Sequence, residues 1–529
     1  MRKRSEEIVR ENHRGVQVLN YRNRPHNLHH ILQASAERFP DKNIFECYSG
    51  KTTYEQFSRD VDRFAAAMQK ILGVRKGDRV ALLLGNDIAF PLTFFAAARI
   101  GAVSVPINTR FVAKEIAYIL DNCGASVVVV HPEYWSECLR AKQSVPGLEH
   151  VVLAGPLGGA IDRFQLSTLL EHREGEPDEV DVGEGDLASI FYTAGTMGMP
   201  KGAMCTHRNF VSNSINTHLV TGSRSDGRGL ICVPLCHPTG CHSQLISGVF
   251  IGSTAVIQRH FNADQTLNLI GKAQITTLVG VPTMYWLLLA QMKLKDYDFG
   301  SLRNVIYGGE PASPELVRRL REVFPSARLG NGYGLTESTS LATFLPDEYA
   351  MEKPDSVGPP VPTVEIRIVN EEGHNLVPGK IGEVLLKGPS VVDGYWKDPE
   401  ATREAFRDGW FYTGDLGRVD DEGFLYIVDR KKDMIIRGGE NIYSVEIENV
   451  LESHPGVFQA AVVGESDKVF GEQVKAYIVP NPGHSLSVDD ILDFCDEHLA
   501  DFKTPKYVEF VDTLPRNPAG NVDKRVLRR

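Results

Sequence analysis

A glycine-rich segment, YTAGTMGMPKG (residues 192–202), has the composition of a loop that holds a phosphate group. It contains three glycines and one lysine, and it follows the apolar run LASIF (residues 187–191), which predicts a strand. Glycines leave backbone N–H groups free to point at anionic oxygens, and Lys201 adds a positive charge. The segment matches neither the GxxxxGK[ST] loop nor the GxGxxG loop. The sequence therefore predicts a phosphate loop of another class, the alternative being a glycine-rich surface loop without a ligand.

Four further segments carry groups that suit a nucleotide. GYGLTE (residues 332–337) follows an expected strand and ends in a carboxylate, a ligand type that Mg²⁺ prefers. YTGD (residues 412–415) presents an aspartate on an expected turn, where it can accept hydrogen bonds from both hydroxyls of a ribose. DRKKDMIIRGGE (residues 429–440) adds Arg430, and YGGEP (residues 307–311) offers a flat glycine surface for a base. Each segment is weak alone, but their order and spacing together are highly specific.

With these motifs the chain resembles the acyl-adenylate-forming superfamily, which contains acyl-CoA synthetases, peptide-synthetase adenylation domains and firefly luciferases. The resemblance extends over residues 28–529, and MIIRGGENIYSVEIE and GYWKDPEATREAF are similar to segments of fatty-acid and aryl-acid CoA ligases. It implies an α/β fold with a large N-terminal domain of parallel-rich sheets covered by helices. A small, mobile α+β C-terminal domain is expected to follow.

The resemblance implies an ATP-dependent carboxylic acid:CoA ligase with a role in fatty-acid metabolism. In such enzymes the acid attacks the α-phosphate of ATP with Mg²⁺ present, and acyl-AMP and pyrophosphate form. The small domain then rotates, and the thiol of CoA attacks the acyl carbon. Two alternatives remain open: an acid-adenylating enzyme with another acceptor or an unusual acid, and a non-catalytic relative that binds a nucleotide or acyl-adenylate.

Position within the motifs assigns the expected roles in the large domain. The phosphate loop is expected to comprise Thr193, Gly195, Thr196, Gly198 and Lys201. Thr336 is expected at the α-phosphate and Glu337 at Mg²⁺, while Asp415 and Arg430 hold the ribose. The adenine is expected to be surrounded by Gly309, Glu310 and Tyr333, and the acyl pocket to be gated by His237. In the small domain the resemblance places Lys432 at the hinge and assigns the pantetheine tunnel to Gly438 and Gly439.

Three positions depart from the family pattern. Ala194 and Met197 stand where the family usually has serine and threonine, and each lost hydroxyl costs about 1.5–3 kcal/mol of phosphate binding if nothing replaces it. In LPRNPAGNVDKR (residues 514–525) Asn521 occupies the place of the lysine that reaches the α-phosphate. Loss of one such charge typically slows a reaction by ~10²–10³. We therefore expect impaired adenylation, and Lys524 can substitute only if its loop shifts.

The elements that must position these groups follow from the apolar pattern. Between residues 78 and 328, helical stretches alternate with the β-branched runs VALLL (80–84), SVVVV (126–130), VVLAG (151–155) and TTLVGV (276–281). That alternation predicts parallel sheets covered by helices. In SPELVRRLREVF (residues 313–324), Ser313 is an N-cap and Pro314 occupies the first turn. The character changes near residue 430, which predicts domains of residues 1–429 and 430–529.

Composition limits the partners. The chain has 529 residues and a formal net charge of −11, which argues against nucleic acid as a partner. Its basic N-terminus lacks the apolar core of a secretory signal, no apolar run reaches transmembrane length, and eight cysteines fit reduced thiols. A cytoplasmic enzyme is expected, with a small carboxylic acid, ATP and CoA as partners and a homo-oligomer compatible with the sequence. Glycines in the expected acyl pocket favour an apolar acyl or aryl acid over acetate.

Overall fold

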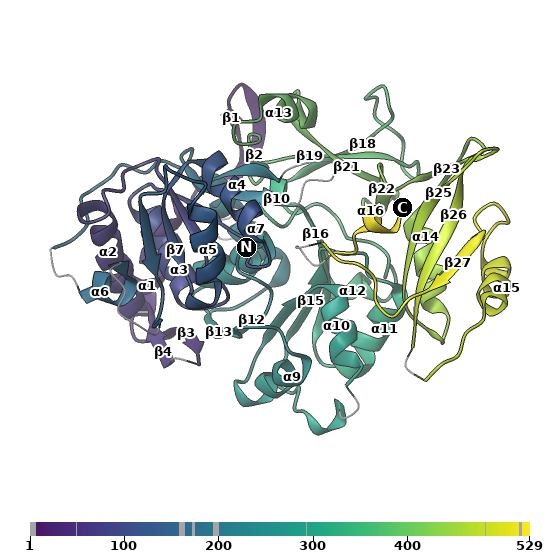
Figure 1. The fold of residues 1–529 in the computed structure, drawn as a ribbon, viewed down its shortest axis with the longest axis horizontal. Coiled ribbons are helices and arrows are strands. Elements are labelled where there is room, and N and C mark those ends of the chain that lie inside the picture. Colours follow the sequence, from purple (N-terminus) through teal and green to yellow (C-terminus); the bar gives the residue numbers. More distant parts are fainter. Residues whose placement is uncertain are drawn as a thin grey trace.

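The computed structural model describes residues 7–48, 50–157, 164–171, 175–193, 200–291, 294–481, 483–517 and 521–528, and Figure 1 shows their fold. Within these ranges the chain forms five sheets, of which the two large, mostly parallel sheets are built from residues 43–345. The predicted α/β fold class is confirmed. No helix among the described residues combines the length and the apolar character needed to span a bilayer.

The first large sheet has seven strands in the order β11-β10-β6-β5-β7-β8-β9. Neighbouring strands are parallel except for β11, which pairs antiparallel with β10. The strands are β5 (Arg79–Leu83), β6 (Val103–Pro106), β7 (Ala125–Val130), β8 (His150–Leu153), β9 (Phe164–Gln165), β10 (Leu187–Thr193) and β11 (Lys201–Thr206). The apolar runs that predicted strands near residues 80, 126, 151 and 187 therefore form β5, β7, β8 and β10.

Helices cover both faces of this sheet because its strands are apolar on both sides. On one face Val80 and Leu82 pack with α1 (Leu28–Arg38), α2 (Tyr54–Lys70) and α3 (Ala89–Arg99). On the other face Ala81 and Leu83 pack with α4 (Ala113–Cys123) and α5 (Trp135–Lys142). Shorter segments nearby are η2 (Pro132–Tyr134) and α6 (Leu166–Glu171).

The second large sheet has eight strands in the order β17-β16-β15-β14-β12-β13-β3-β4. Its central strands are parallel, and β17 and β4 are antiparallel at the edges. The strands are β3 (Asn43–Cys47), β4 (Gly50–Thr53), β12 (Arg228–Ile231), β13 (Thr254–Ile257), β14 (Thr277–Gly280), β15 (Asn304–Gly308), β16 (Arg328–Tyr333) and β17 (Thr343–Leu345). The predicted strand at TTLVGV is β14.

Two groups of helices sandwich the second sheet. One face carries α9 (Ala263–Lys272), α10 (Pro282–Leu289) and α11 (Pro314–Val323), with η4 (Leu294–Asp296) close by in the chain. Ser313 caps α11 by accepting a hydrogen bond from the N–H of Leu316, as the sequence predicts. The other face carries α7 (His207–Thr221), the π-helix η3 (Thr239–Ile246) and α8 (Ser247–Ile251).

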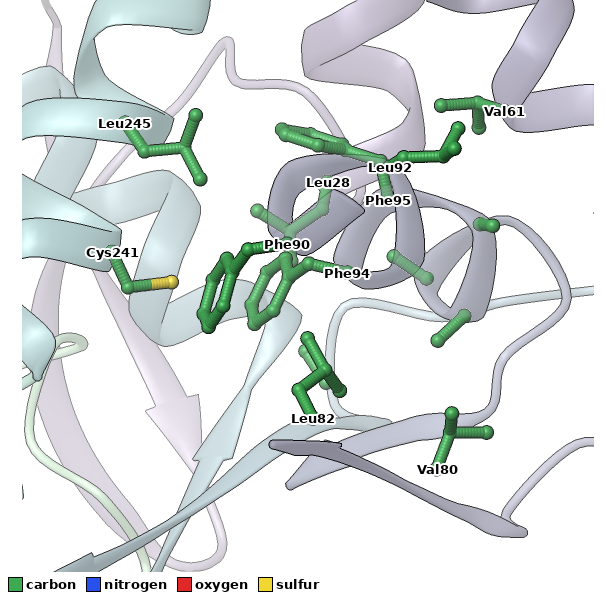
Figure 2. Close-up of a cluster of buried hydrophobic side chains, with 14 of the residues drawn as sticks. Leu28, Val61, Val80, Leu82, Phe90, Leu92, Phe94, Phe95, Cys241 and Leu245 are labelled. Carbon is green, nitrogen blue, oxygen red and sulfur yellow. The ribbon is translucent and has the colours of Figure 1, made fainter. Parts of the chain in front are cut away.

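One hydrophobic core joins the two large sheets. Figure 2 shows Phe90 and Phe94 of α3 between strand residue Leu82 and the η3 residues Cys241 and Leu245. The rings of Phe90 and Phe94 are stacked with centroids 6.1 Å apart. This shared core fixes the phosphate-loop strands of one sheet relative to the glycine-rich strands of the other.

A third, antiparallel sheet follows, with the order β18-β19-β21-β20 and with β22 paired to β21. Its strands are β18 (Glu365–Val369), β19 (Gly382–Lys387), β20 (Phe406–Arg407), β21 (Trp410–Val419) and β22 (Leu425–Arg430). The expected turn at YTGD is wrong: Asp415 lies within the ten-residue strand β21. Gly414 has φ of 72° and lies in a bulge of β21, where this backbone conformation favours glycine. Because the same residue type is typical of turns, the composition of YTGD predicted a turn. Helix α12 (Asp347–Ala350) precedes these strands in the chain, and α13 (Pro399–Ala405) lies between β19 and β20. The N-terminal hairpin β1 (Ile8–His13)–β2 (Val16–Tyr21) contacts this region through a 2.8 Å hydrogen bond between His13 and Asp393.

The C-terminal residues form an α+β unit with its own core. The sheet order is β24-β23-β26-β25, and β27 runs parallel to β26. The elements are β23 (Ile435–Arg437), β24 (Glu440–Ile442), α14 (Ser444–Ser453), β25 (Val457–Asp467), β26 (Gly471–Pro480), α15 (Val488–His498), β27 (Tyr507–Phe510) and α16 (Lys524–Leu527). Ile447 and Leu451 of α14 pack against Val462 and Ile478 of the sheet. In Figure 1 this unit lies to the right, and the segment after β27 turns back toward β16.

Candidate active site

The site begins where β15 and β16 end, at a surface made almost entirely of backbone. Gly308 pairs with Gly332 in the ladder, and a Cβ on Gly308 would lie 2.0 Å from the carbonyl oxygen of Gly332. Gly309 has φ of +82°, and a Cβ on Gly334 would lie 1.4 Å from the carbonyl oxygen of Ser340. Glycine is therefore required at these positions. Flat, unhindered backbone at the carboxyl ends of parallel strands is where α/β sheets bind ligands.

A polar triad built around the buried side chain of Asp415 lies beside this surface. The hydroxyl of Tyr333 donates to Oδ2 of Asp415 over 2.6 Å, and Nε of Arg430 lies 3.0 Å from Oδ1. β21 and β22 bring the last two together, because Asp415 and Arg430 are directly paired in the ladder. Burial and the neighbouring Asp415 carboxylate raise the pKa of Tyr333 well above its usual value, so this phenol stays a donor. The triad thus fixes the carboxyl group of Asp415 at the edge of the glycine surface.

Glu337 lies in the short helix η5 (Thr336–Ser338), immediately after the β16 loop. Its Oε1 accepts a hydrogen bond from the hydroxyl of Tyr395 over 2.7 Å. Burial raises the pKa of Glu337, while this hydrogen bond and the positive charge of Arg430 oppose the rise. Among the described residues no group of three or more His, Cys, Asp and Glu could hold a metal. A single buried carboxylate suits Mg²⁺ that is held mainly by phosphate oxygens, so Glu337 fits the predicted ligand.

Tyr395 also connects Glu337 to the phosphate loop. The ammonium group of Lys201 lies over its ring, 5.4 Å from the centroid. The N–H of Trp396 donates to the carbonyl of Gly202 over 2.7 Å, which ties this segment to β11. Tyr395 belongs to the segment GYWKDPEATREAF, in which the sequence alone assigned it no role. Nothing in the sequence pairs it with Glu337, 58 residues away.

The predicted phosphate loop lies only partly within the described residues. Thr193 and Lys201 form the last pair of the β10–β11 hairpin and mark the two ends of the loop. Its remaining predicted members, Gly195, Thr196 and Gly198, and the departures Ala194 and Met197 lie outside the described residues.

The C-terminal unit reaches this site through the segment after β27. Arg516 lies 3.7 Å from Oε1 of Glu310 and donates to Thr283 over 3.4 Å and to Gln459 over 3.1 Å. Glu310, predicted beside adenine, is thus held by Arg516 and by both the N–H and the hydroxyl of Thr283. This contact joins the glycine loop after β15 to the C-terminal residues.

Asn521 stands on the far arm of the same segment and is exposed. Its N–H donates to Oδ1 of Asn517 over 3.1 Å, and its carbonyl accepts from the N–H of Asn517 over 2.8 Å. Lys524 points elsewhere: its ammonium group lies 2.7 Å from Glu448 and donates to Ser444 over 2.7 Å. Burial lowers the pKa of Lys524, but the carboxylates of Glu448 and Asp429 more than offset this and raise it. Lys524 is therefore fully engaged with α14 and does not replace the missing lysine in this structure.

The remaining predicted residues lie away from the triad. Lys432 stands between β22 and β23, and its carbonyl accepts a hydrogen bond from Arg528 over 3.0 Å. Gly438 and Gly439 form the turn between β23 and β24 with φ of 60° and 93°, which favours glycine. His237 lies two residues before η3 in the chain, and burial lowers the pKa of its imidazole to about 4. This histidine is not among the residues that line the cavity described next.

A cavity of about 110 Å³ opens from the glycine surface into the second sheet. It is walled by β12, β14, β15 and β16 on one side and by α7, η3 and α8 on the other. Gly308, Gly309 and Gly332 line it at the end nearest the triad. A nucleotide on the glycine surface would therefore have its α-phosphate above an enclosed space suited to an acyl group.

The comparisons agree with this geometry. The chain matches the model of the AMP-binding enzyme family over residues 32–396 and that of the AMP-binding enzyme C-terminal domain over residues 446–521. It is 38% identical to a feruloyl-CoA synthase of Amycolatopsis sp over 477 residues, covering 90% of this chain and 93% of that protein. It is 35% identical to an indoleacetate–CoA ligase of Aromatoleum aromaticum, covering 93% and 94%.

Solved structures of adenylate-forming enzymes superpose on 95% of this chain. ATP-bound MatB from Rhodopseudomonas palustris aligns with a TM-score of 0.86 at 33% identity, covering 95% of this chain and 98% of that one. The anthranilate CoA ligase AuaEII in complex with anthranoyl-AMP aligns with a TM-score of 0.86 at 28% identity, covering 95% and 96%.

Two large α/β sheets, with the triad of Tyr333, Asp415 and Arg430 beside the glycine surface, are the arrangement of an adenylate-forming protein. The chain belongs to the AMP-binding enzyme family. It is an ATP-dependent acid:CoA ligase of the AMP-forming class, with ATP and CoA as co-substrates and Mg²⁺ as the expected metal. The predictions of family, fold class and enzyme class are confirmed.

Proposed function

We propose that this ligase activates an apolar acyl or aryl acid larger than acetate and transfers it to CoA. The observation that carries the proposal is the cavity between β14, β15 and η3, which begins at the glycine surface and is much larger than an acetyl group needs. Relatives of this chain include a feruloyl-CoA synthase, an indoleacetate–CoA ligase and a 2-succinylbenzoate–CoA ligase, which supports an aryl acid. Because a long-chain fatty-acid–CoA ligase is also among the relatives, fatty acids are included in the test of this proposal.

In the adenylation step, Asp415 accepts hydrogen bonds from the ribose hydroxyls, and Arg430 and Tyr333 hold the carboxylate in place. The adenine lies on the backbone of Gly309 with Glu310 nearby.

Lys201, together with Thr193 and the phosphate loop, binds the β- and γ-phosphates, while Thr336 contacts the α-phosphate. Glu337 would hold Mg²⁺, which would supply neutralisation of the phosphate charge. The carboxylate of the acid then attacks the α-phosphorus, and pyrophosphate leaves.

The second half-reaction needs another orientation of the C-terminal residues. We propose that residues 430–529 rotate about Lys432 and bring Gly438 and Gly439 to the acyl-adenylate, where they line the path of the pantetheine thiol. The four residues between β22 and β23 form the connection that must change its backbone angles. His237, just before η3, does not line the cavity, so no gating role is assigned to it. The eight cysteines, all of them among the described residues, form no disulfide, which supports a cytoplasmic enzyme.

A single assay tests the proposal. The purified chain is incubated with ATP, Mg²⁺, CoA and a panel of acids from acetate to aryl-propenoic and medium-chain acids, and both AMP and the CoA thioester are quantified. We expect both products from aryl or medium-chain acids and at least tenfold less from acetate. AMP release without a thioester would favour an acceptor other than CoA. Absence of AMP with every acid would contradict the proposal.

The matched variant is Asp415→Asn, which keeps the shape of the side chain but removes the charge that faces the ribose. We expect this change to raise the KM for ATP while the fold is retained. Asp420→Asn is the control, because that aspartate pairs with Lys353 away from the triad.

A further inference from the structure

Two residues of α4 hydrogen-bond to the chain on either side of the predicted phosphate loop. On the incoming strand β10, the hydroxyl of Tyr192 donates to Oδ1 of Asn122 over 2.5 Å. On the outgoing side, the carbonyl of Pro200 accepts from the hydroxyl of Tyr118 over 3.4 Å. Tyr192 and Pro200 each stand one residue before a member of the strand pair that marks the ends of the loop. One helix therefore holds the chain near both ends of the loop.

The backbone of Asn122 binds a second part of the site. Its carbonyl accepts a hydrogen bond from Nε1 of Trp396 over 3.2 Å. Trp396 directly follows Tyr395, whose hydroxyl donates to Glu337 over 2.7 Å. The side chain of Asn122 thus holds the strand that enters the phosphate loop, and its carbonyl holds the segment that orients the expected Mg²⁺ ligand.

Packing keeps these groups together on one face of the first sheet. The side chains of Tyr118, Tyr192 and Trp396 all pack against the core that lies between this sheet and α4. Gly202 pairs with Tyr192 in the ladder. A Cβ on Gly202 would lie 2.7 Å from Ile190, 3.2 Å from the ring of Tyr192 and 3.3 Å from Cβ of Trp396. Glycine at this position therefore lets the two aromatic side chains lie close to β11 and to each other's partner, α4.

The end of α4 that carries Asn122 is itself fixed in place. Nε of Arg79, on β5, donates to the carbonyl of Cys123 over 2.7 Å. The same guanidinium lies over the ring of Trp396, 5.9 Å from the centroid. Burial raises the pKa of Tyr192, so its phenol stays protonated and remains a donor to Asn122. The hydrogen bonds of Asn122 therefore start from a rigid position, which is what a group that orients a site requires.

We propose that Asn122 is a positioning residue for adenylation, which holds the phosphate loop through Tyr192 and the segment beside Glu337 through Trp396. It acts through these two aromatic residues, and so keeps Lys201 and Glu337 in one arrangement around the phosphates of ATP. The proposal rests on the proposed function, because it concerns the ATP site of the same ligase. Acyl-AMP has no β- or γ-phosphate, so the thioester half-reaction does not need this arrangement.

The test measures the two half-reactions separately in Tyr192→Phe and Asn122→Ala. Pyrophosphate release is followed at varied ATP with the most active acid of the panel, and thioester formation is followed from supplied acyl-AMP and CoA. We expect kcat/KM for ATP to fall at least tenfold in both variants, because a displacement of about 1 Å in a reacting complex can cost ~10² in rate. Thioester formation should stay within twofold of the parent.

The outcomes separate this proposal from its foundation. Unchanged kcat/KM for ATP, or equal losses in both half-reactions, would overturn the positioning role while leaving the ligase function intact. Absence of pyrophosphate release from the parent protein with every acid would refute the ligase function and the positioning role together. Because the two variants remove the same hydrogen bond, the double variant should be no slower than the slower single variant, and additive losses would contradict action through this bond.

Further variants distinguish positioning from stability. Asn122→Asp keeps the acceptor for Tyr192 and should restore kcat/KM for ATP to within threefold of the parent. Trp396→Phe removes the Nε1 donor and should lower adenylation alone. Tyr21→Phe is the matched control, since that buried phenol donates to Oδ1 of Asn216 over 2.7 Å, between β2 and α7. It should lower the melting temperature without changing the ratio of the two half-reactions. If Asn122→Ala fails to fold, Tyr192→Phe alone decides, and an unchanged ratio refutes the proposal.

Discussion

Asn521 is the residue with the largest predicted effect on rate. It stands in the segment that Arg516 anchors at the nucleotide site, and its amide carries no charge to neutralise the α-phosphate. We predict that Asn521→Lys raises the adenylation rate by about 10²-fold or more. The thioester half-reaction, started from acyl-AMP and CoA, should change far less, because the proposed rotation removes residue 521 from the acyl carbon. Single-turnover measurements of the two half-reactions check this expectation.

Lys524 provides the control for that experiment. Its pairing with Glu448 and Ser444 means that Lys524→Ala leaves a buried carboxylate unpaired, at a cost of about 3–5 kcal/mol. We expect a lower melting temperature and an adenylation rate per folded molecule close to that of the parent. A folded Lys524→Ala protein that has lost adenylation, with no gain in Asn521→Lys, would mean that Lys524 performs the function assigned to residue 521.

The hydroxyl of Tyr395 controls the charge of Glu337. Burial raises the pKa of this carboxyl, and the hydrogen bond from Tyr395 opposes the rise. Because the carboxylate binds Mg²⁺ only when ionised, activity should be present above its pKa and lost as the pH falls through it. Tyr395→Phe removes the hydrogen bond, so we predict that the acid limb of the adenylation profile moves to higher pH. Hydrogen bonds to charged groups contribute about 1.5–3 kcal/mol, so the rate on that limb should fall about tenfold or more.

The ring that remains in Tyr395→Phe still lies under Lys201, which separates the hydroxyl from the cation–π contact. Tyr426→Phe is the matched control, because its hydroxyl donates to Asp420 away from the site. A pH profile of Tyr395→Phe that coincides with the parent would show that this hydroxyl does not tune the metal ligand.

At the scale of the elements, α14 carries an acidic residue whose ionisation opposes folding. Burial, together with the nearby carboxylate of Glu448, raises the pKa of Glu452 from 4.5 to about 8. The folded protein therefore keeps a proton that the unfolded chain loses, and stability falls as the pH rises from about 4.5 to about 8. We predict that Glu452→Gln, which retains an acceptor for the N–H of Ala460, removes this loss. Melting temperatures from pH 5 to 8.5 should diverge in favour of the variant as the pH rises, and parallel curves would contradict the assignment.

Strands and helix starts were predictable from the sequence wherever a short run of neighbouring residues specifies them. β5, β7, β8, β10 and β14 follow from β-branched runs, and the start of α11 follows from its serine cap and proline. Asp415 was expected on a turn because YTGD has turn composition. The pairing of Asp415 with Arg430, however, keeps the strand continuous through a bulge at Gly414. Local composition favours a turn at YTGD because it carries no information about β22, the partner strand that pairs with these residues.

The site was predictable only through motifs. Tyr333, Asp415 and Arg430 come from separate motifs, and the structure brings them within hydrogen-bonding distance. Tyr395 escaped prediction because its role depends on a long-range contact, to Glu337. Such contacts are fixed by the fold as a whole, and no spacing in the sequence encodes them.

At the scale of the whole molecule, Arg516 joins the C-terminal unit to the nucleotide site. Arg516 bridges to Glu310 and Thr283 of the large body, and Gln459 holds it from its own side. This orientation brings the segment of Asn521 to the site of adenylation. The proposed rotation would break the bridge before CoA is used.

Arg516→Met should therefore weaken adenylation selectively. A partly exposed ion pair contributes up to about 1 kcal/mol, which corresponds to a loss of roughly fivefold in the adenylation rate. The thioester half-reaction from supplied acyl-AMP should be unchanged or faster, because the competing orientation has lost a contact. Lys506→Met is the control, since that lysine pairs with Asp467 within the C-terminal unit, 3.2 Å away. Equal losses in both half-reactions for Arg516→Met would mean that the bridge stabilises the fold rather than one orientation of the domains.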